Sequence, residues 1–416
     1  MDTLMNDLRK IDKTEELAIT TWSPLAIKAF RAMWIVWLAS NIGMWMSDVT
    51  TAWLMTSLTT STVMVALVQS ALTLPIFLFA LPSGTLADRL DRRTYALLTQ
   101  VWTGMVGFAM TAILVAGWMS PSLLLAFTFL NGMGFAMRWP IYASIVPQLV
   151  PRLQLPGALA LNSIAFNASR ILGPTLAGAL IAAQGMTAVF ALNAAVSLLM
   201  IPLILRWPPL RRVAAAPGDG FIRSMSEGVK HVRSNAALRA VLLRISIFFF
   251  HSAALVSLLP VLAREFSSGQ ANEFTLMLAS MGAGAIIAAA LIPQLRKRLT
   301  ANQMLVQGGL LHAVGTVAIG YAPSAFVAIP ALVACGMAWL VLSNVVTLAA
   351  QLALPDWVRA RGMAFYMMAI MGSAAVGAAV WGQVANLTSV REAFLISLLS
   401  AVTALVLCRQ VRVGDL

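Results

Sequence analysis

The sequence predicts an all-α membrane protein with twelve transmembrane helices in two six-helix bundles. Three observations indicate this class. Apolar residues make up 60% of the 416 residues and charged residues only 10%, against about 25% charged residues in average soluble proteins. Long runs are almost free of charge, whereas residues 206–237 collect arginines and prolines. So few charges could not cover a soluble surface, which excludes a cytosolic enzyme, a disordered protein and a secreted disulfide scaffold.

Three long runs provide six helices in the first half of the chain. Residues 32–87, 94–151 and 153–205 each contain a single charged side chain. A transmembrane helix needs about 20 mostly apolar residues, so each run accommodates two. Turn-forming residues near positions 59–62, 120–122 and 184–185 divide the runs. The apolar runs are too long for the strands of a membrane β-barrel, which need about 10 residues each.

The second half has the same organisation. Five uncharged runs follow the arginine-rich segment: 245–263, 274–295, 299–355, 362–390 and 393–408. The third run is long enough for two helices, which turn-forming residues near 321–324 would divide. Similar tetrapeptides at 29–32 and 237–240 favour a duplicated bundle. We therefore expect an arm, a bundle, a linker, a second bundle and a tail: 1–22, 23–205, 206–237, 238–409 and 410–416.

The lysines and arginines predict the orientation, because cytoplasmic loops hold the excess of these residues. If the N-terminus is cytoplasmic, 23 of the 28 lysines and arginines fall on the cytoplasmic side and 2 in outer loops. Both termini are therefore expected in the cytoplasm. The net charge of +13 is dispersed over short loops that face anionic lipid. We therefore expect a lipid bilayer as the partner, and we do not expect nucleic acid.

One loop motif resembles that of a known family. Residues 84–93, GTLADRLDRR, lie between the second and third expected helices. They resemble the signature loop of the major facilitator superfamily, except that Asp91 replaces the small residue that is usual at its position. The resemblance implies a cytoplasmic latch that breaks and re-forms as the bundles rock. A basic loop that only sets orientation is the alternative. The latch residues would be Gly84, Asp88, Arg89, Arg92 and Arg93.

Other segments are similar to one branch of that superfamily. Residues 40–45, 173–178 and 228–233 resemble a bacterial exporter group that contains the enterobactin exporter and macrolide efflux proteins. The resemblance implies a bacterial inner membrane protein. Gly173, Pro174 and Gly178 are similar to the helix-five motif of drug–proton antiporters. Ser169 replaces that motif's first glycine, which weakens the inference of antiport.

Three charges inside expected spans are candidates for proton coupling: Asp48, Arg138 and Arg170. A charge at the bilayer centre costs about 2.5–3.5 kcal/mol on insertion scales, so each requires a partner or a role. Counting 1.5 Å per residue from the expected helix starts places Asp48 and Arg170 at similar depths, about 21 and 18 Å, and Arg138 lower, at about 14 Å. In one interpretation Asp48 carries a proton across the membrane beside an arginine. In the other, Asp48 and Arg170 form a fixed ion pair between helices one and five.

Polar and aromatic residues at helical spacing indicate a substrate cavity. Asn41 and Trp45 share a face with Asp48, and Asn131 and Tyr142 share one with Arg138. The alternative for such residues is a packed core, and for His251 a neutral hydrogen-bonded histidine. Because no second acidic residue lies in a span, neutral, anionic or zwitterionic amphiphiles are favoured as substrates. The expected cavity residues are Asn41, Trp45, Asn131, Tyr142, His251, Ser343, Asn344 and Thr347.

The sequence contains no motif for enzymatic chemistry. It lacks a phosphate-binding lysine loop, a His-Glu-x-x-His motif and a cluster of carboxylates for a metal, so no cofactor is expected. We therefore expect a secondary transporter, acting as a monomer, that exports drugs, siderophore-like compounds or other small amphiphiles, with proton antiport as the coupling. A major facilitator importer or uniporter, transport driven by membrane potential, and a membrane enzyme or signalling scaffold are the alternatives.

Overall fold

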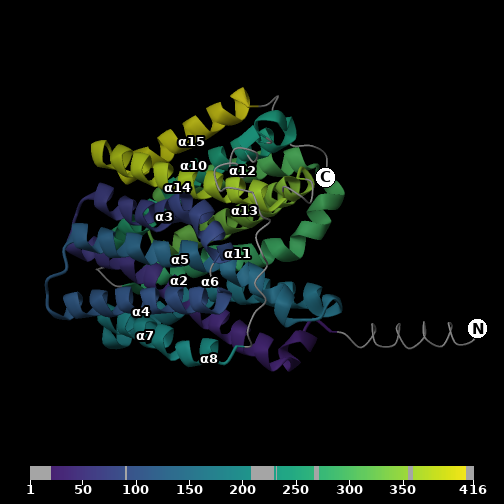
Figure 1. The fold of residues 1–416 in the computed structure, drawn as a ribbon. Coiled ribbons are helices and arrows are strands. Elements are labelled where there is room, and N and C mark those ends of the chain that lie inside the picture. Colours follow the sequence, from purple (N-terminus) through teal and green to yellow (C-terminus); the bar gives the residue numbers. More distant parts are fainter. Residues whose placement is uncertain are drawn as a thin grey trace, which may run out of the picture.

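The computed structural model is almost entirely helical and describes residues 20–89, 91–207, 229–230, 232–266, 271–354 and 359–408. Most of the expected arm, linker and tail lies outside these residues. Within them, the long helices run roughly alongside one another (Figure 1). This arrangement confirms the predicted all-α membrane fold.

The described residues of the first half form helices that are consistent with six spans. Helices α2 to α6 are each at least 24 residues long, and the sixth span is formed by α7 and α8 in immediate succession. Short 3-10 helices η1 (Ser23–Ala26) and η2 (Arg152–Gln154) precede α2 and α6. The helices are α2 (Lys28–Leu58), α3 (Thr62–Arg89), α4 (Arg92–Val115), α5 (Pro121–Leu149), α6 (Leu155–Gln184), α7 (Met186–Leu199) and α8 (Ile201–Leu205).

The second half contains six more long helices, and the described residues are thus consistent with twelve spans. Nine of the described segments are long and apolar enough to cross a membrane. The remaining three, α2, α5 and α12, are 31, 29 and 20 residues long, and so also meet the length that a span needs. The helices of this half are α10 (Ala236–Phe266), α11 (Ala271–Arg298), α12 (Ala301–Gly320), α13 (Ala325–Leu352), α14 (Arg359–Leu387) and α15 (Val390–Leu407).

Several helix boundaries have side-chain caps at the turns that the sequence indicates. Ser120 and Ser324 accept hydrogen bonds from the backbone three residues later, which satisfies free N–H groups at the starts of α5 and α13. Thr300 and Gln303 form a reciprocal capping box at the start of α12. Gly185 separates α6 from α7 with a φ of 83°, a conformation that glycine adopts without strain.

The two halves contact each other closely at one end of the molecule. We define the distal end as the one at which α2 gives way to α3 and α10 to α11. There a single apolar cluster contains residues of both halves, including Trp53 and Phe274, whose rings stack with centroids 5.8 Å apart. At the opposite, proximal end each half has its own cluster. The molecule is therefore closed distally, with α3 packed along α14 between the halves (Figure 1).

Candidate functional site

A central cavity of about 290 Å³ lies between the two halves. Its wall comes from α2, α3, α5 and α6 of the first half and from α10, α11, α13 and α14 of the second. These are the first, second, fourth and fifth spans of each half, as a duplicated bundle requires. The wall is mainly apolar, with a few polar groups, which is typical of small-molecule sites.

Asp48 of α2 is the acidic residue among those that line the cavity. Its Oδ1 atom is buried without a hydrogen-bond partner, and it forms no salt bridge with any residue that the structure describes. Its electrostatic partner is Arg138 of α5. An unsatisfied buried carboxylate is costly, so this position requires a functional explanation more than an ordinary structural one.

Arg138 is buried between α5 and α2, with a relative exposure of 4%. It donates a hydrogen bond to the Ser40 carbonyl over 3.5 Å and lies 3.8 Å from the Met44 sulfur. Its guanidinium carbon is 5.6 Å from the centre of the Phe135 ring. Arg138 therefore lies beside the helix that carries Asp48 and holds a positive charge close to the carboxylate.

Arg170 of α6 lies between two tryptophans rather than against the acid. Its guanidinium carbon is 5.9 Å from the ring centre of Trp45 on α2 and 5.6 Å from that of Trp339 on α13. Trp339 belongs to the other half, so this arginine bridges the halves across the cavity. The expected fixed ion pair between Asp48 and Arg170 is not formed in this structure.

Two further expected cavity residues, Trp45 and Asn131, line the cavity, but Asn41 and Tyr142 do not. Asn41 is buried and donates to the Trp37 carbonyl over 2.7 Å. The Tyr142 ring packs against Trp37 in the proximal apolar cluster of the first half. These two side chains face neighbouring helices instead of this cavity, and their part in binding a substrate stays a prediction.

The polar stripe expected on the tenth span also faces other helices. Asn344 accepts a hydrogen bond from Arg296 of α11 over 2.8 Å, and Thr347 pairs with the Tyr366 hydroxyl of α14 at 2.8 Å. Ser343 does not line the central cavity either. Asn344 and Thr347 therefore join helices within the second half instead of lining the central cavity.

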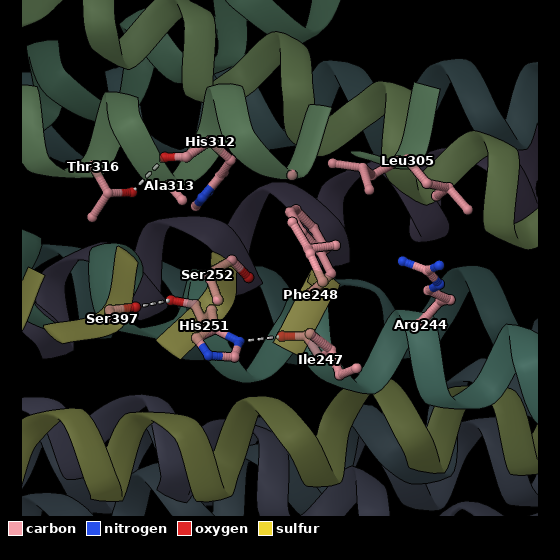
Figure 2. Close-up of a pocket in the computed structure, with 14 residues that line it drawn as sticks. Arg244, Ile247, Phe248, His251, Ser252, Leu305, His312, Ala313, Thr316 and Ser397 are labelled. Carbon is pink, nitrogen blue, oxygen red and sulfur yellow. Dashed lines mark hydrogen bonds between the residues drawn. The ribbon is translucent and has the colours of Figure 1, made fainter. Parts of the chain in front are cut away.

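His251 lines a separate, smaller cavity of about 40 Å³ within the second half (Figure 2). Its Nδ1 is 2.7 Å from the Ile247 carbonyl and its Nε2 is 3.1 Å from the Ser400 hydroxyl. Figure 2 shows His312 across the cavity from His251, and Arg244 at the opposite end, beyond Phe248. This volume holds at most a few waters, so His251 is better explained as a structural, hydrogen-bonded histidine.

The helix-five motif places small residues where α6 meets two other helices. A Cβ atom added to Gly173 would collide with the Cβ atom of Trp45 on α2. One added to Gly178 would lie 2.5 Å from the Thr275 hydroxyl on α11, in the opposite half. Pro174 lies between these contacts and lines the cavity. The glycines thus permit close approach of α6 within its own half and across the interface.

The latch motif ends α3 and begins α4. The side-chain environments of Gly84, Asp88, Arg89 and Arg92 lie outside the described part of the structure. Arg93 donates a hydrogen bond to the Leu205 carbonyl at the end of α8. The Asp91 carboxylate accepts from the Thr94 backbone over 2.9 Å and thereby caps α4. The gating role of the loop stays a prediction.

Sequence reasoning missed Gln69 and Thr73, which line the cavity from α3. Their spacing of four residues in a mainly apolar helix was an available signal. Trp339 was recognisable as a deep tryptophan, but its contact with Arg170 depends on how the two halves meet. Among the described residues, no group of three or more His, Cys, Asp or Glu side chains could hold a metal ion.

The helices and the cavity together define a class, the multi-pass membrane transporters of the major facilitator fold. The nucleoside transporter NupG shares the fold with a TM-score of 0.73 at 12% identity, covering 92% of this chain and 99% of that one. A D-xylose–proton symporter shares the fold with a TM-score of 0.70 at 12% identity, and the match covers 90% of this chain and 97% of that one. Within this class the chain belongs to the family described as transmembrane secretion effector, whose model matches residues 19–416.

Curated relatives of the chain include efflux proteins. Macrolide efflux protein A of Enterococcus faecalis is 25% identical over 221 residues, covering 53% of this chain and 68% of that protein. The Streptococcus pyogenes protein of the same name is matched over only 55% of its length. The staphyloferrin A transporter of Staphylococcus aureus is 20% identical over 281 residues, covering 67% and 70%. Fold and relatives are thus those of membrane transporters of small molecules.

Proposed function

We propose that this protein exports small amphiphilic molecules by alternating access, coupled to proton antiport. The observation that carries the proposal is the central cavity between the halves, with Asp48 in its wall, whose buried Oδ1 accepts no hydrogen bond from a described residue. Drugs and siderophore-like compounds are the proposed substrates. The cavity offers mainly apolar contacts and a few polar ones, which suits amphiphiles of varied shape.

The distal closure supports a direction of transport. If both termini are cytoplasmic, as the lysines and arginines predict, the closed end faces outward and the cavity loads from the cytoplasm. The names of the macrolide efflux relatives point the same way. We propose a bacterial inner membrane location and a monomer, since the cavity is formed within one chain. Labelling of single cysteines in the loops from either side of the membrane tests the orientation.

Proton coupling is proposed for Asp48 together with Arg138. When Asp48 is ionised, the nearby arginine stabilises the carboxylate; when it is protonated, that attraction is lost and the arginine is freed to interact elsewhere. Exposure of the carboxylate to alternate sides would then couple the entry of a proton to the exit of substrate. The arginine's contacts with Ser40 and Met44 on α2 keep it beside the acid.

The test is transport in vesicles that contain the purified protein. A radiolabelled macrolide is the probe, and its efflux is measured with and without an imposed pH gradient. We expect the gradient to accelerate efflux in the wild type and to have no effect in Asp48→Asn. Asp91→Asn is the matched control, because asparagine also caps helices and this residue lies outside the cavity.

Each other outcome selects an alternative. Efflux that ignores the pH gradient in the wild type but follows membrane potential would refute antiport. Net uptake under the same gradient would identify an importer. Gradient dependence that persists in Asp48→Asn would return Asp48 to a structural role. A compound screen in a host without its own pumps would then extend the substrate range beyond the macrolide probe.

A further inference from the structure

Two opposite charges line the central cavity without neutralising each other. Asp48 on α2 and Arg170 on α6 both belong to the wall, yet they form no salt bridge. A buried ion is normally paired, because leaving one uncompensated costs several kcal/mol. Both are placed where an occupant of the cavity would meet them. Their complement is therefore to be sought in that occupant.

The acidic part of the site lacks a donor. The Oδ1 atom of Asp48 is buried and accepts no hydrogen bond from any described residue. Arg138 acts on it electrostatically, but the guanidinium itself contacts the Ser40 carbonyl, the Met44 sulfur and the Phe135 ring. The carboxylate thus retains capacity for a cationic donor such as an ammonium group.

The basic part of the site lacks an acceptor. Arg170 lies over the rings of Trp45 and Trp339, and its N–H groups form no hydrogen bond with any residue that the structure describes. They are therefore available to an anion in the guanidinium plane. The indole Nε1 of Trp45 is also buried without a partner. A carboxylate placed between Trp45 and Arg170 would supply acceptors to both residues.

We propose that the site prefers zwitterions, with an ammonium group held by Asp48 and an anionic group held by Arg170 beside Trp45; a substrate with one charge, such as a macrolide, would engage only one of the two residues. Phe249, Phe274 and Leu278 of the opposite half would enclose the apolar body. The assignment rests on the proposed use of this cavity for substrate. It also fits antiport, because an ammonium group and a proton would compete for the same carboxylate.

Four probes with one apolar body separate the two charges. Phenylalanine carries both, N-acetylphenylalanine only the negative one, phenylalanine amide only the positive one, and N-acetylphenylalanine amide neither. Their affinities are measured by equilibrium dialysis against the full-length protein in detergent. We expect phenylalanine to bind about tenfold more tightly than either singly charged probe, and the neutral probe to bind most weakly. Asp48→Asn should abolish only the preference for the ammonium group, and Arg170→Gln only that for the carboxylate.

The remaining outcomes are decisive. A wild type that binds none of the probes, or prefers the carboxylate but ignores the ammonium group, overturns the zwitterion proposal. The proposal is also overturned if Asp48→Asn keeps the preference for the ammonium group and Arg170→Gln keeps the preference for the carboxylate. If a neutral variant fails to bind even the uncharged probe, Asp48→Glu and Arg170→Lys decide, because they must keep the preferences. Binding does not depend on the direction of transport or on its coupling to protons. Failure of pH-driven efflux would therefore leave the binding result standing, and loss of the charge preferences would leave the efflux result standing.

Discussion

The contact between Gly178 and Thr275 predicts that a single methyl group will shift the conformational equilibrium. A Cβ atom at Gly178 would lie 2.5 Å from the Thr275 hydroxyl, 2.8 Å from its methyl carbon and 3.0 Å from its Cβ. Overpacking of this kind typically costs about 1–3 kcal/mol. Because α6 and α11 belong to different halves, the cost falls on the distally closed state. Gly178→Ala should therefore favour the distally open state by about 5- to 150-fold.

Labelling of a reporter cysteine measures this shift. Val256 lines the cavity from α10, and Cys335 and Cys408 are first replaced by serine so that Val256→Cys is the reporter. A membrane-impermeant maleimide applied from the distal side should react faster in Gly178→Ala. Thr275→Ala removes two of the three closest atoms and should partly restore the wild-type rate, which a double-mutant cycle quantifies.

Gly173→Ala is the matched control. Its added Cβ would collide with Trp45, which lies in the same half. The halves move as units in alternating access, so this cost should affect both states equally. Gly173→Ala should lower the melting temperature but leave the labelling rate unchanged. Equal acceleration by both variants, or none by Gly178→Ala, would refute the reasoning.

Two further predictions concern packing and closure. Gly336→Ala should lower the melting temperature in detergent far more than Gly309→Ala. A Cβ at Gly336 would collide with the Met281 backbone carbonyl, whereas one at Gly309 would meet Leu405 at an ordinary 3.7 Å. Equal shifts of the melting temperature would contradict this packing. The Thr62 hydroxyl lies 3.5 Å from the Gly382 carbonyl, and a Cβ at Gly382 would collide with the Ala66 Cβ. Cysteines at Thr62 and Gly382 in an Ala66→Gly background, which makes room for the new Cβ, should therefore cross-link and stop macrolide efflux until reduced; undiminished efflux from a fully cross-linked sample would disprove distal opening.

Charge-free runs and turn residues were sufficient to predict the helices. Water and lipid impose those boundaries directly, because a charged loop cannot enter the hydrocarbon region. The partner of Asp48 could not be predicted in the same way. Depth was counted from an expected start near Trp34, whereas α2 begins at Lys28. Counting from Lys28 raises the depth of Asp48 by about 9 Å and moves it farther from the expected depth of Arg138, so depth counted along the helices does not identify the partner.

Helical periodicity identified faces but not their neighbours. Thr347 and Asn344 lie on one side of α13, as their spacing predicts, but Tyr366 and Arg296 cover that side. Trp45 and Asn131 line the cavity because the faces that carry them meet the opposite half. Which face meets the cavity depends on the rotation of each helix about its axis, and that rotation is set by packing with helices distant in sequence.

A substrate shifts a conformational equilibrium only if it binds the two states differently. Arg170 provides such a difference, since its contact with Trp45 moves with its own half whereas its contact with Trp339 crosses the cavity. A substrate carboxylate that draws Arg170 from Trp339 would release about 0.5–2 kcal/mol of cation–π stabilisation from the distally closed state.

Trp339→Leu removes this link while it leaves Arg170 and Trp45 in place. Phenylalanine should accelerate distal labelling of the Val256→Cys reporter in the wild type, and the variant should reduce this effect by about 2- to 30-fold. The preference for the carboxylate should persist, because Trp339 makes no contact with the substrate's anionic group in the proposed site. A Trp339→Leu protein that responds to phenylalanine as the wild type does would show that the bridge between the halves plays no part in coupling binding to movement.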